Sequence, residues 1–157
     1  MNAAFEKLIQ HLDARDLRYR ADNDAGSICV DFRGDVGTYR VIAAVDADGE
    51  MFEVFGCAPV RVPAGARPSV AETVVRANYG LRLGKLEMGY DDGEIRFQLA
   101  HALTNGVLDD SVIARSFGAA LVMLDRYLPA VLSVIYGNEL PADAVRAAEQ
   151  LESPESD

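Results

Sequence analysis

Residues 78–103, NYGLRLGKLEMGYDDGEIRFQLAHAL, contain the alternation of apolar and polar side chains that decides the fold of this chain. Apolar residues recur at every second position on both sides of Asp92 and Gly93, which predicts two half-buried strands joined by a tight two-residue turn. The predicted register has four features: Tyr90 pairs with Ile95, Met88 with Phe97, Leu86 with Leu99, and Glu87 lies opposite Gln98 and diagonal to Arg96. A slip of one residue would set Met88 against Arg96, so the pattern favours this pairing.

Length and charge limit the class of protein. The chain has 157 residues, of which half are hydrophobic and a quarter charged, and these values are typical of one folded domain. We expect a single domain over residues 1–152 and a disordered acidic tail over residues 153–157. The net charge of -10 would repel phosphate backbones and anionic lipids, so nucleic acid and membranes are not expected partners.

The two cysteines, Cys29 and Cys57, fall on the second and fourth expected strands. Two strand spacings amount to roughly 9.6 Å, whereas a disulfide needs Cα atoms closer than about 7 Å. We therefore expect free thiols and a reducing compartment. Residues 1–12 form an amphipathic helix pattern without the apolar core of a signal peptide, and the longest charge-free apolar segment, residues 127–138, is too short to span a bilayer. A cytoplasmic location is the expectation.

The first half of the chain predicts a helix and four strands. Apolar residues at helical spacing predict a helix over residues 3–14, and a charged edge strand follows over residues 17–22. Two further strands have alternating core positions, which are Ile28, Val30, Phe32, Tyr39, Val41, Ala43 and Val45, and a fourth strand is expected over residues 50–60. A two-residue loop at positions 48 and 49 would place Phe52 opposite Val45 and Val54 opposite Ala43. A longer loop with a bulge would exchange the two faces of the fourth strand.

The second half predicts three helices around the hairpin. Ser69 and Glu72 have the spacing of a capping box at the start of one helix. Asp109 is expected to cap the longest helix, which Pro129 should kink or break. A short helix over residues 142–151 ends the fold. The order favours an α+β class, with a single antiparallel sheet of about six strands and helices packed on one face.

The fourth strand is apolar on both sides, which leaves an apolar strip on the sheet face away from the helices. The strip consists of Cys29, Ile42, Ala44, Met51, Phe55 and Cys57. Such a strip is usually covered, either by the same molecule or by a second subunit. We therefore predict that it is a partner or dimer surface.

Four short motifs resemble the YbjN-type domain family. They are PxxVP at residues 59–63, NxGLxLGxLEM at 78–88, DGEIRF at 92–97 and LDRYLP at 124–129. The similarity extends from about Phe5 to Glu149 and implies the fold of type III secretion chaperones. It also implies a binding or regulatory role without enzymatic activity, since relatives with this fold are dimers that hold extended segments of partner proteins. The family pattern supplies no catalytic or ligand-binding residue.

No group of residues predicts catalysis, a cofactor or a metal site. His11 and His101 lack a Cys, Asp or Glu at metal-ligand spacing, so structural roles are expected. The cysteines have no recognisable base beside them, and the acidic residues at positions 91–94 are explained by the turn. Four arginines could line a surface for an anion or an acidic partner, although a solvated strand face is the simpler interpretation; they are Arg18, Arg20, Arg33 and Arg40.

The sequence favours a non-enzymatic protein-interaction module, chaperone-like or regulatory, that binds a segment of a partner protein as a homodimer. The alternative is a small-ligand sensor or an enzyme with a pocket between the sheet and the break at Pro129. A structural subunit of a larger assembly is a third hypothesis.

Overall fold

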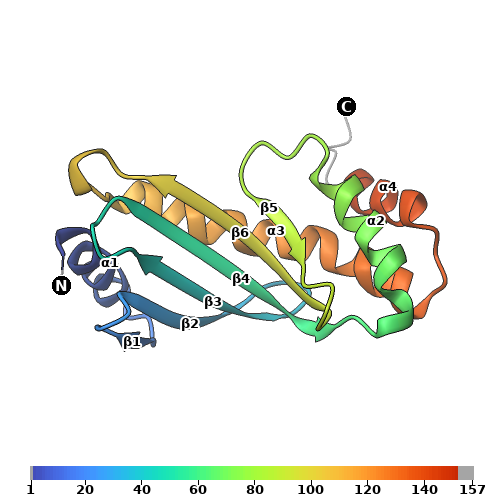
Figure 1. The fold of residues 1–157 in the computed structure, drawn as a ribbon, viewed down its shortest axis with the longest axis horizontal. Coiled ribbons are helices and arrows are strands. Elements are labelled where there is room, and N and C mark those ends of the chain that lie inside the picture. Colours follow the sequence, from blue (N-terminus) through green and yellow to red (C-terminus); the bar gives the residue numbers. More distant parts are fainter. Residues whose placement is uncertain (1, 152–157) are drawn as a thin grey trace.

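Six strands form one antiparallel sheet in the order β1-β2-β3-β4-β6-β5 in the computed structural model, which describes residues 2–151 (Figure 1). The strands are β1 (Arg20–Asp22), β2 (Ser27–Arg33), β3 (Thr38–Val45), β4 (Met51–Arg61), β5 (Lys85–Met88) and β6 (Glu94–Ala102). The helices are α1 (Ala3–Ala14), α2 (Arg67–Asn78), α3 (Asp110–Tyr136) and α4 (Pro141–Gln150), with 3-10 turns η1 (Ala64–Ala66) and η2 (Thr104–Gly106). This confirms the predicted α+β class. The expected tail over residues 153–157 lies outside the described residues.

Helices α1 and α3 cover one face of the sheet, and no described helix lies over the other, which we call the open face (Figure 1). In Figure 1, α3 runs along the sheet on the side away from the viewer, and α2 and α4 lie together at one end. The alternate side chains that point toward α1 and α3 are buried, among them Tyr39, Val41, Phe52, Val54 and Phe97. They form one core cluster with Phe5, Leu8 and Leu12 of α1 and Ile113 and Leu124 of α3. The core side of β2, β3 and β4 is therefore the side that the alternation predicted.

The β3–β4 pairing is also the predicted one. Phe52 lies opposite Val45 and Val54 opposite Ala43, so the bulge that would exchange the faces of β4 does not occur between these strands. The backbone N–H of Asp46 donates to the carbonyl of Met51 at 3.1 Å, which closes the turn. The Asp46 carboxylate accepts the N–H groups of Glu50 and Met51 at 2.7 and 2.9 Å and satisfies the donors of the turn.

The β5–β6 register differs from the prediction by two residues. Leu86 pairs with Phe97 and Met88 with Ile95, so Tyr90 lies in the turn and is exposed. The N–H of Gly89 donates to the carbonyl of Glu94 at 2.9 Å, which makes a four-residue turn in place of the expected two. A shift of two keeps every side chain on its face, because the side-chain period of a strand is two.

The start of α2 also differs from the prediction. The helix begins at Arg67, with Pro68 in its first turn and no side-chain cap, so the predicted capping box of Ser69 and Glu72 is wrong. Proline needs no hydrogen-bond acceptor in the first turn of a helix, and this allows the earlier start. Glu72 instead pairs with Arg76 one turn later at 3.1 Å.

Helix α3 is continuous through Pro129, so the predicted break does not occur. Asp109 caps its start as expected, with a carboxylate oxygen that accepts the N–H of Val112 at 2.9 Å. Proline removes one backbone donor, but Leu124, Leu128 and Val131 on either side of it are buried against the core. We attribute the continuity of the helix to this packing.

By length and composition, α3 would also suffice to cross a membrane. The same properties belong to the core helix of a folded domain. Ten of its side chains are buried, and Ile113, Phe117, Ala120 and Leu124 follow one another along the stripe that faces the sheet. The apolar character of α3 is therefore accounted for by its place in the core.

Candidate functional site on the open sheet face

The open face carries the predicted apolar strip. The pairing places Cys29 opposite Ile42 and Ile42 opposite Phe55, so these three side chains form one row across β2, β3 and β4. Ala44 and Met51 lie nearer the β3–β4 turn, and Cys57 lies on the other side of the row. All six residues of the strip are half-buried. The structure thus brings the six together on one face, as the alternation predicted; their role as a binding surface stays a prediction.

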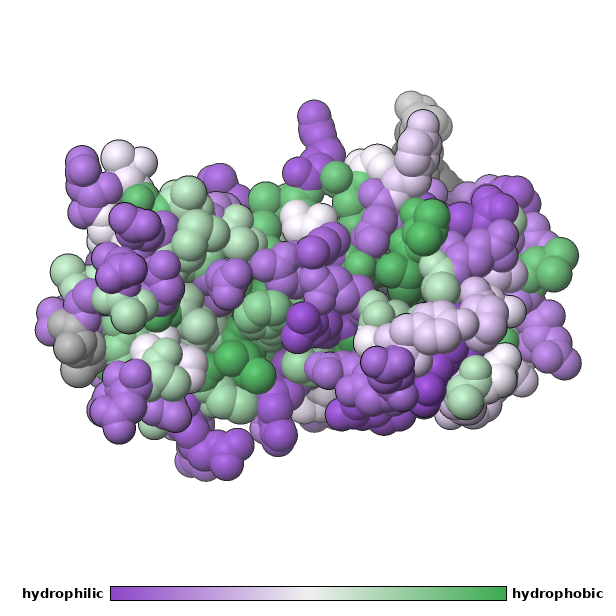
Figure 2. Space-filling view, viewed as in Figure 1, coloured by the Kyte–Doolittle hydropathy of each residue, from purple (hydrophilic) through white to green (hydrophobic). Residues whose placement is uncertain are grey.

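Charged side chains interrupt and flank the strip. Figure 2, which looks onto this face, shows hydrophobic residues over the sheet with hydrophilic ones between them. The guanidinium of Arg96 lies over the Phe55 ring, 4.7 Å from its centroid. Glu87 on β5 lies directly opposite Arg96 and holds it with an oxygen 2.7 Å from Nε. The aromatic end of the row is therefore covered by a cation that is fixed in place.

Acidic residues gather at the β5–β6 end of the face, around a hollow of about 290 Å³. Glu87 accepts from Lys85 at 2.9 Å as well as from Arg96, and Asp92 accepts from Arg61 at 2.9 Å. Burial opposes ionisation of Glu87, but the hydrogen bonds from its two cationic partners outweigh it and lower the pKa of the carboxyl. These carboxylates are therefore ionised and already paired within the molecule.

Arginines gather at the opposite end of the face, near the β1 edge. A hollow of about 430 Å³ is lined by Arg18, Tyr19, Arg20, Cys29, Asp31 and Arg40. Three of the four arginines singled out from the sequence meet here, whereas Arg33 does not line the hollow. Alternation alone predicts that Arg40 points outward, but it does not predict that residues 18–20 come against it. The sequence offers these arginines as one possible surface, but it gives no signal for how closely residues 18–20 approach Arg40, because β1 is only three residues long and the chain before it is irregular.

Both cysteines are free thiols, as predicted, and β3 lies between their strands. The Cys57 Sγ donates to a Glu94 carboxylate oxygen at 3.7 Å. Burial and the neighbouring Glu94 raise the pKa of the Cys57 thiol. Since the thiolate is the nucleophilic form, this environment disfavours a catalytic role for Cys57.

The histidines have structural contacts. The Nδ1 atom of His11, a buried residue on α1, lies 2.8 Å from a carboxylate oxygen of Asp110 at the start of α3. The Nε2 atom of His101 lies 3.1 Å from Ser116 Oγ, and its ring stacks on Phe52. Within residues 2–151 no group of three or more His, Cys, Asp or Glu side chains is placed to hold a metal ion.

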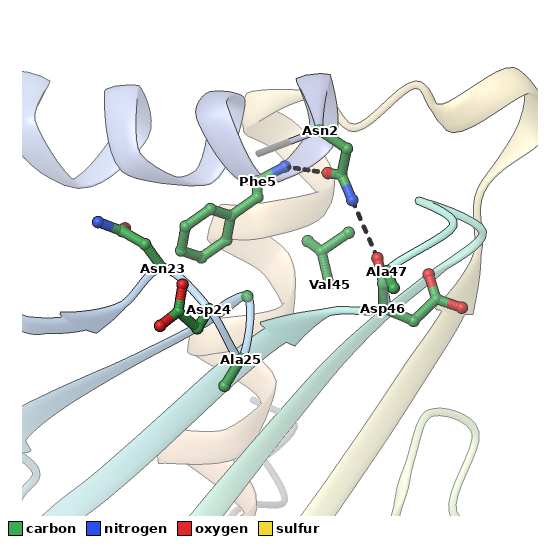
Figure 3. A pocket seen from close by; sticks show the side chains of 9 residues that line it. Asn2, Phe5, Asn23, Asp24, Ala25, Val45, Asp46 and Ala47 are labelled. Carbon is green, nitrogen blue, oxygen red and sulfur yellow. Dashed lines mark hydrogen bonds between the residues drawn. The ribbon is translucent and has the colours of Figure 1, made fainter.

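Two further hollows lie away from the strip. One of about 220 Å³ lies where α1 begins, and Figure 3 shows Phe5 and Val45 at its wall. There the side-chain amide of Asn2 donates to the Asp46 carbonyl at 2.9 Å, and its oxygen caps α1 by accepting the N–H of Phe5 at 2.9 Å. These two hydrogen bonds satisfy the side-chain amide of Asn2 and attach the start of α1 to the β3–β4 turn.

The second hollow, of about 570 Å³, is a groove between α2 and α4. Its apolar lining includes Val75 and Tyr79, whose exposed fractions are 70% and 91%. Neither hollow is lined by Pro129, where the alternative hypothesis expected a pocket, and the helix is unbroken there.

Residues 4–133 match the YbjN family, described as "Putative bacterial sensory transduction regulator". The crystal structure of YbjN from E. coli, described as "a putative transcription regulator", is similar with a TM-score of 0.56 and 12% identity, over 94% of this chain and 92% of that chain. A HopA1-SchA chaperone-effector complex is similar with a TM-score of 0.46 and 14% identity, over 75% and 88% of the two chains. No curated protein matches the sequence.

Proposed function

We propose that this chain, which belongs to the YbjN family, is a protein-binding module whose open sheet face holds a segment of a partner polypeptide. The observation that carries the proposal is the row of Cys29, Ile42 and Phe55 on a sheet face that no helix within residues 2–151 covers (Figure 1). Half-buried apolar side chains in a continuous row favour contact with another chain over contact with water. The proposed role is chaperone-like or regulatory, in the bacterial cytoplasm, and involves neither catalysis nor a cofactor.

Homodimer formation is part of the proposal, through a different surface. The groove between α2 and α4 has exposed Val75 and Tyr79 along it. Each wall also carries both charges, Glu72 with Arg76 on α2 and Arg146 with Glu149 on α4. A two-fold interface needs a surface that complements itself, and a groove with both charges on each wall meets that requirement. A dimer built here would leave the open face free for the partner.

Affinity purification from source lysate tests the binding face. The wild-type chain is compared with Ile42→Glu, which places a charge in the centre of the row, and with Val122→Glu, the same type of change at an exposed position on α3. We expect the wild type and Val122→Glu to capture the same protein, and Ile42→Glu to lose it. Equal capture by all three would contradict a role for the open face.

Sedimentation velocity tests the dimer. Val75→Glu should shift the chain toward the monomer at micromolar concentration, while Val107→Glu, at another exposed site, should not. A wild-type monomer at these concentrations would remove the dimer from the proposal.

A further inference from the structure

We propose that the arginine hollow, lined by Arg18, Arg20 and Arg40 beside Cys29, binds a carboxylate side chain of the partner segment, so that the partner is an acidic polypeptide. The inference rests on the proposed function of the open face and adds the chemistry of its partner. The arginine hollow is a positively charged site, although the net charge of the whole chain is -10.

The hollow is open to an incoming anion because its cations are exposed and weakly compensated. Arg18 and Arg20 have no ion-pair partner among residues 2–151. Arg40 is 3.5 Å from Asp31, the acid directly opposite it on β2, and among the described residues Asp31 is the one acid in the lining. Only one of the three guanidinium groups is therefore paired with a carboxylate, and these planar donors suit a second one.

The acidic end of the open face, at β5 and β6, is a poor match for the arginine hollow of a second copy. Glu87 is held between Lys85 and Arg96, and Asp92 is paired with Arg61. In a second copy turned so that its acidic end met the arginine hollow, two of the three acids that line that end, Glu87 and Asp92, would first have to leave these pairs. Charge complementarity therefore favours an external acidic segment over a second copy.

The hollow is also continuous with the apolar row. Arg20 lies opposite Cys29, so one line across the sheet runs from Arg20 through Cys29 and Ile42 to Phe55. This line covers three strand spacings, about 14 Å, and an extended peptide covers about 13.6 Å between residues i and i+4. A segment that crosses the strands can therefore place an acid at i over the arginines, an apolar side chain at i+2 over Cys29 and Ile42, and one at i+4 beside Arg96, which covers Phe55.

Three fluorescein-labelled heptapeptides test the inference. Each has two leucines at alternate positions after a variable residue, with serine at the other positions, and the variable residue is Glu, Gln or Lys. Fluorescence anisotropy is measured for the wild-type chain, for the triple variant Arg18→Gln, Arg20→Gln, Arg40→Gln, and for Arg115→Gln, an exposed arginine on α3. Circular dichroism checks that each variant folds.

We expect the wild type to bind the Glu peptide about 10-fold more tightly than the Gln peptide, since two or three exposed charge pairs contribute that order of affinity. The triple variant should lose this preference, Arg115→Gln should keep it, and 0.5 M NaCl should reduce it. Alkylation of Cys29 in a Cys57→Ser background gives a second readout, because a bound Glu peptide should slow it and the Lys peptide should not.

Equal affinity for the Glu and Gln peptides, with both lost in Ile42→Glu, would overturn the inference and leave the open face as a binding surface. Failure of the wild type to bind any of the peptides would count against both proposals. A Glu preference that the triple variant retains would show that the acid binds elsewhere. Protection of Cys29 from alkylation by inorganic phosphate, together with equal binding of all three peptides, would mark the hollow as a simple anion site and overturn the acidic-partner assignment.

Discussion

Asp125 on α3 fixes the turn between β2 and β3, and its replacement should destabilise the fold. Its carboxylate accepts the hydroxyl of Tyr39 at 2.6 Å and the backbone N–H groups of Asp35 and Val36 at 2.9 and 3.0 Å. We call this arrangement the turn clamp. Tyr39 is fully buried, so its hydroxyl depends on this partner, whereas the two backbone donors lie near solvent.

The expected loss of stability follows from the hydrogen-bond donors that lose their acceptor when Asp125 is replaced. Removal of the acceptor in Asp125→Ala leaves a buried hydroxyl unsatisfied, at about 1–3 kcal/mol, and two exposed charge-assisted hydrogen bonds add a smaller amount. We expect a loss of about 2–4 kcal/mol in the free energy of unfolding, which lowers Tm by roughly 5–15 °C in a chain of this size. Asp125→Asn keeps one acceptor oxygen and should lose only about 1 kcal/mol.

The loss should depend on pH in a defined direction. Burial raises the pKa of Asp125, but the hydrogen bonds from Tyr39 and the two backbone donors outweigh it, and the net pKa is lowered. The carboxylate therefore stabilises the fold fully above about pH 4, the ordinary range for an aspartate, and this contribution is lost as pH falls through the lower folded pKa. The difference between wild type and Asp125→Ala should shrink at low pH.

Urea denaturation followed by circular dichroism, from pH 7 down to pH 2.5, measures both effects. Tyr39→Phe and the double variant complete a mutant cycle, in which the coupling energy should exceed about 0.5 kcal/mol. Asp143→Ala is the control, since it removes an exposed ion pair at 3.0 Å and should change stability by less than about 0.5 kcal/mol. A loss below 0.5 kcal/mol in Asp125→Ala, or one that does not vary with pH, would refute the reasoning.

Three further changes are expected to be measurable in the same denaturation assay. Gly34→Ala would place a Cβ 2.5 Å from a carboxylate oxygen of the turn clamp and should destabilise the fold by about 1–3 kcal/mol. A Cβ at Gly65 would have no atom within 4 Å, so Gly65→Ala should not destabilise the fold, and equal losses in the two variants would contradict the steric argument. Asp110→Ala removes the shared partner of Lys7, the buried His11 and Arg15, and should destabilise more than Glu72→Ala, which removes one exposed ion pair and should lose less than about 0.5 kcal/mol. Pro129→Ala should stabilise by about 1–2 kcal/mol because it restores a backbone donor at an exposed site within α3, and any loss of stability would show that the proline is accommodated without strain.

The fold was predictable where alternation decides it. The core faces of β2, β3 and β4 and the β3–β4 register follow from the positions of apolar residues, because only one pairing buries them all. The β5–β6 register was not predictable, because the length of the hairpin turn depends on contacts with residues outside the hairpin. Gly93 has φ +76°, and its carbonyl accepts the N–H of Val62 at 2.8 Å, which attaches the hairpin turn to the chain beyond β4.

One part of the candidate site, the apolar strip, was predictable from the sequence, and the rest was not. The six residues of the apolar strip share a face because of the two-residue period of strands, and the sequence predicted that face. The arginine hollow depends on where the irregular chain before β1 meets β3, and the pairing of Glu87 with Arg96 depends on the two-residue shift of the hairpin. Placement of this kind is determined by contacts between segments distant in sequence, which no local pattern encodes.

The strand order has a consequence for the route by which the chain folds. Strands β1 to β4 are neighbours in both sequence and space, so they can zip together in successive hairpins. Strand β6 can pair with β4 only when residues 62–93 form a closed loop between them. The chain entropy lost on closing this loop opposes the pairing until the contacts between β4 and β6 have formed. Amides of β3 should accordingly gain protection in pulsed hydrogen exchange before those of β6, and the reverse order would place the nucleus in the second half of the chain.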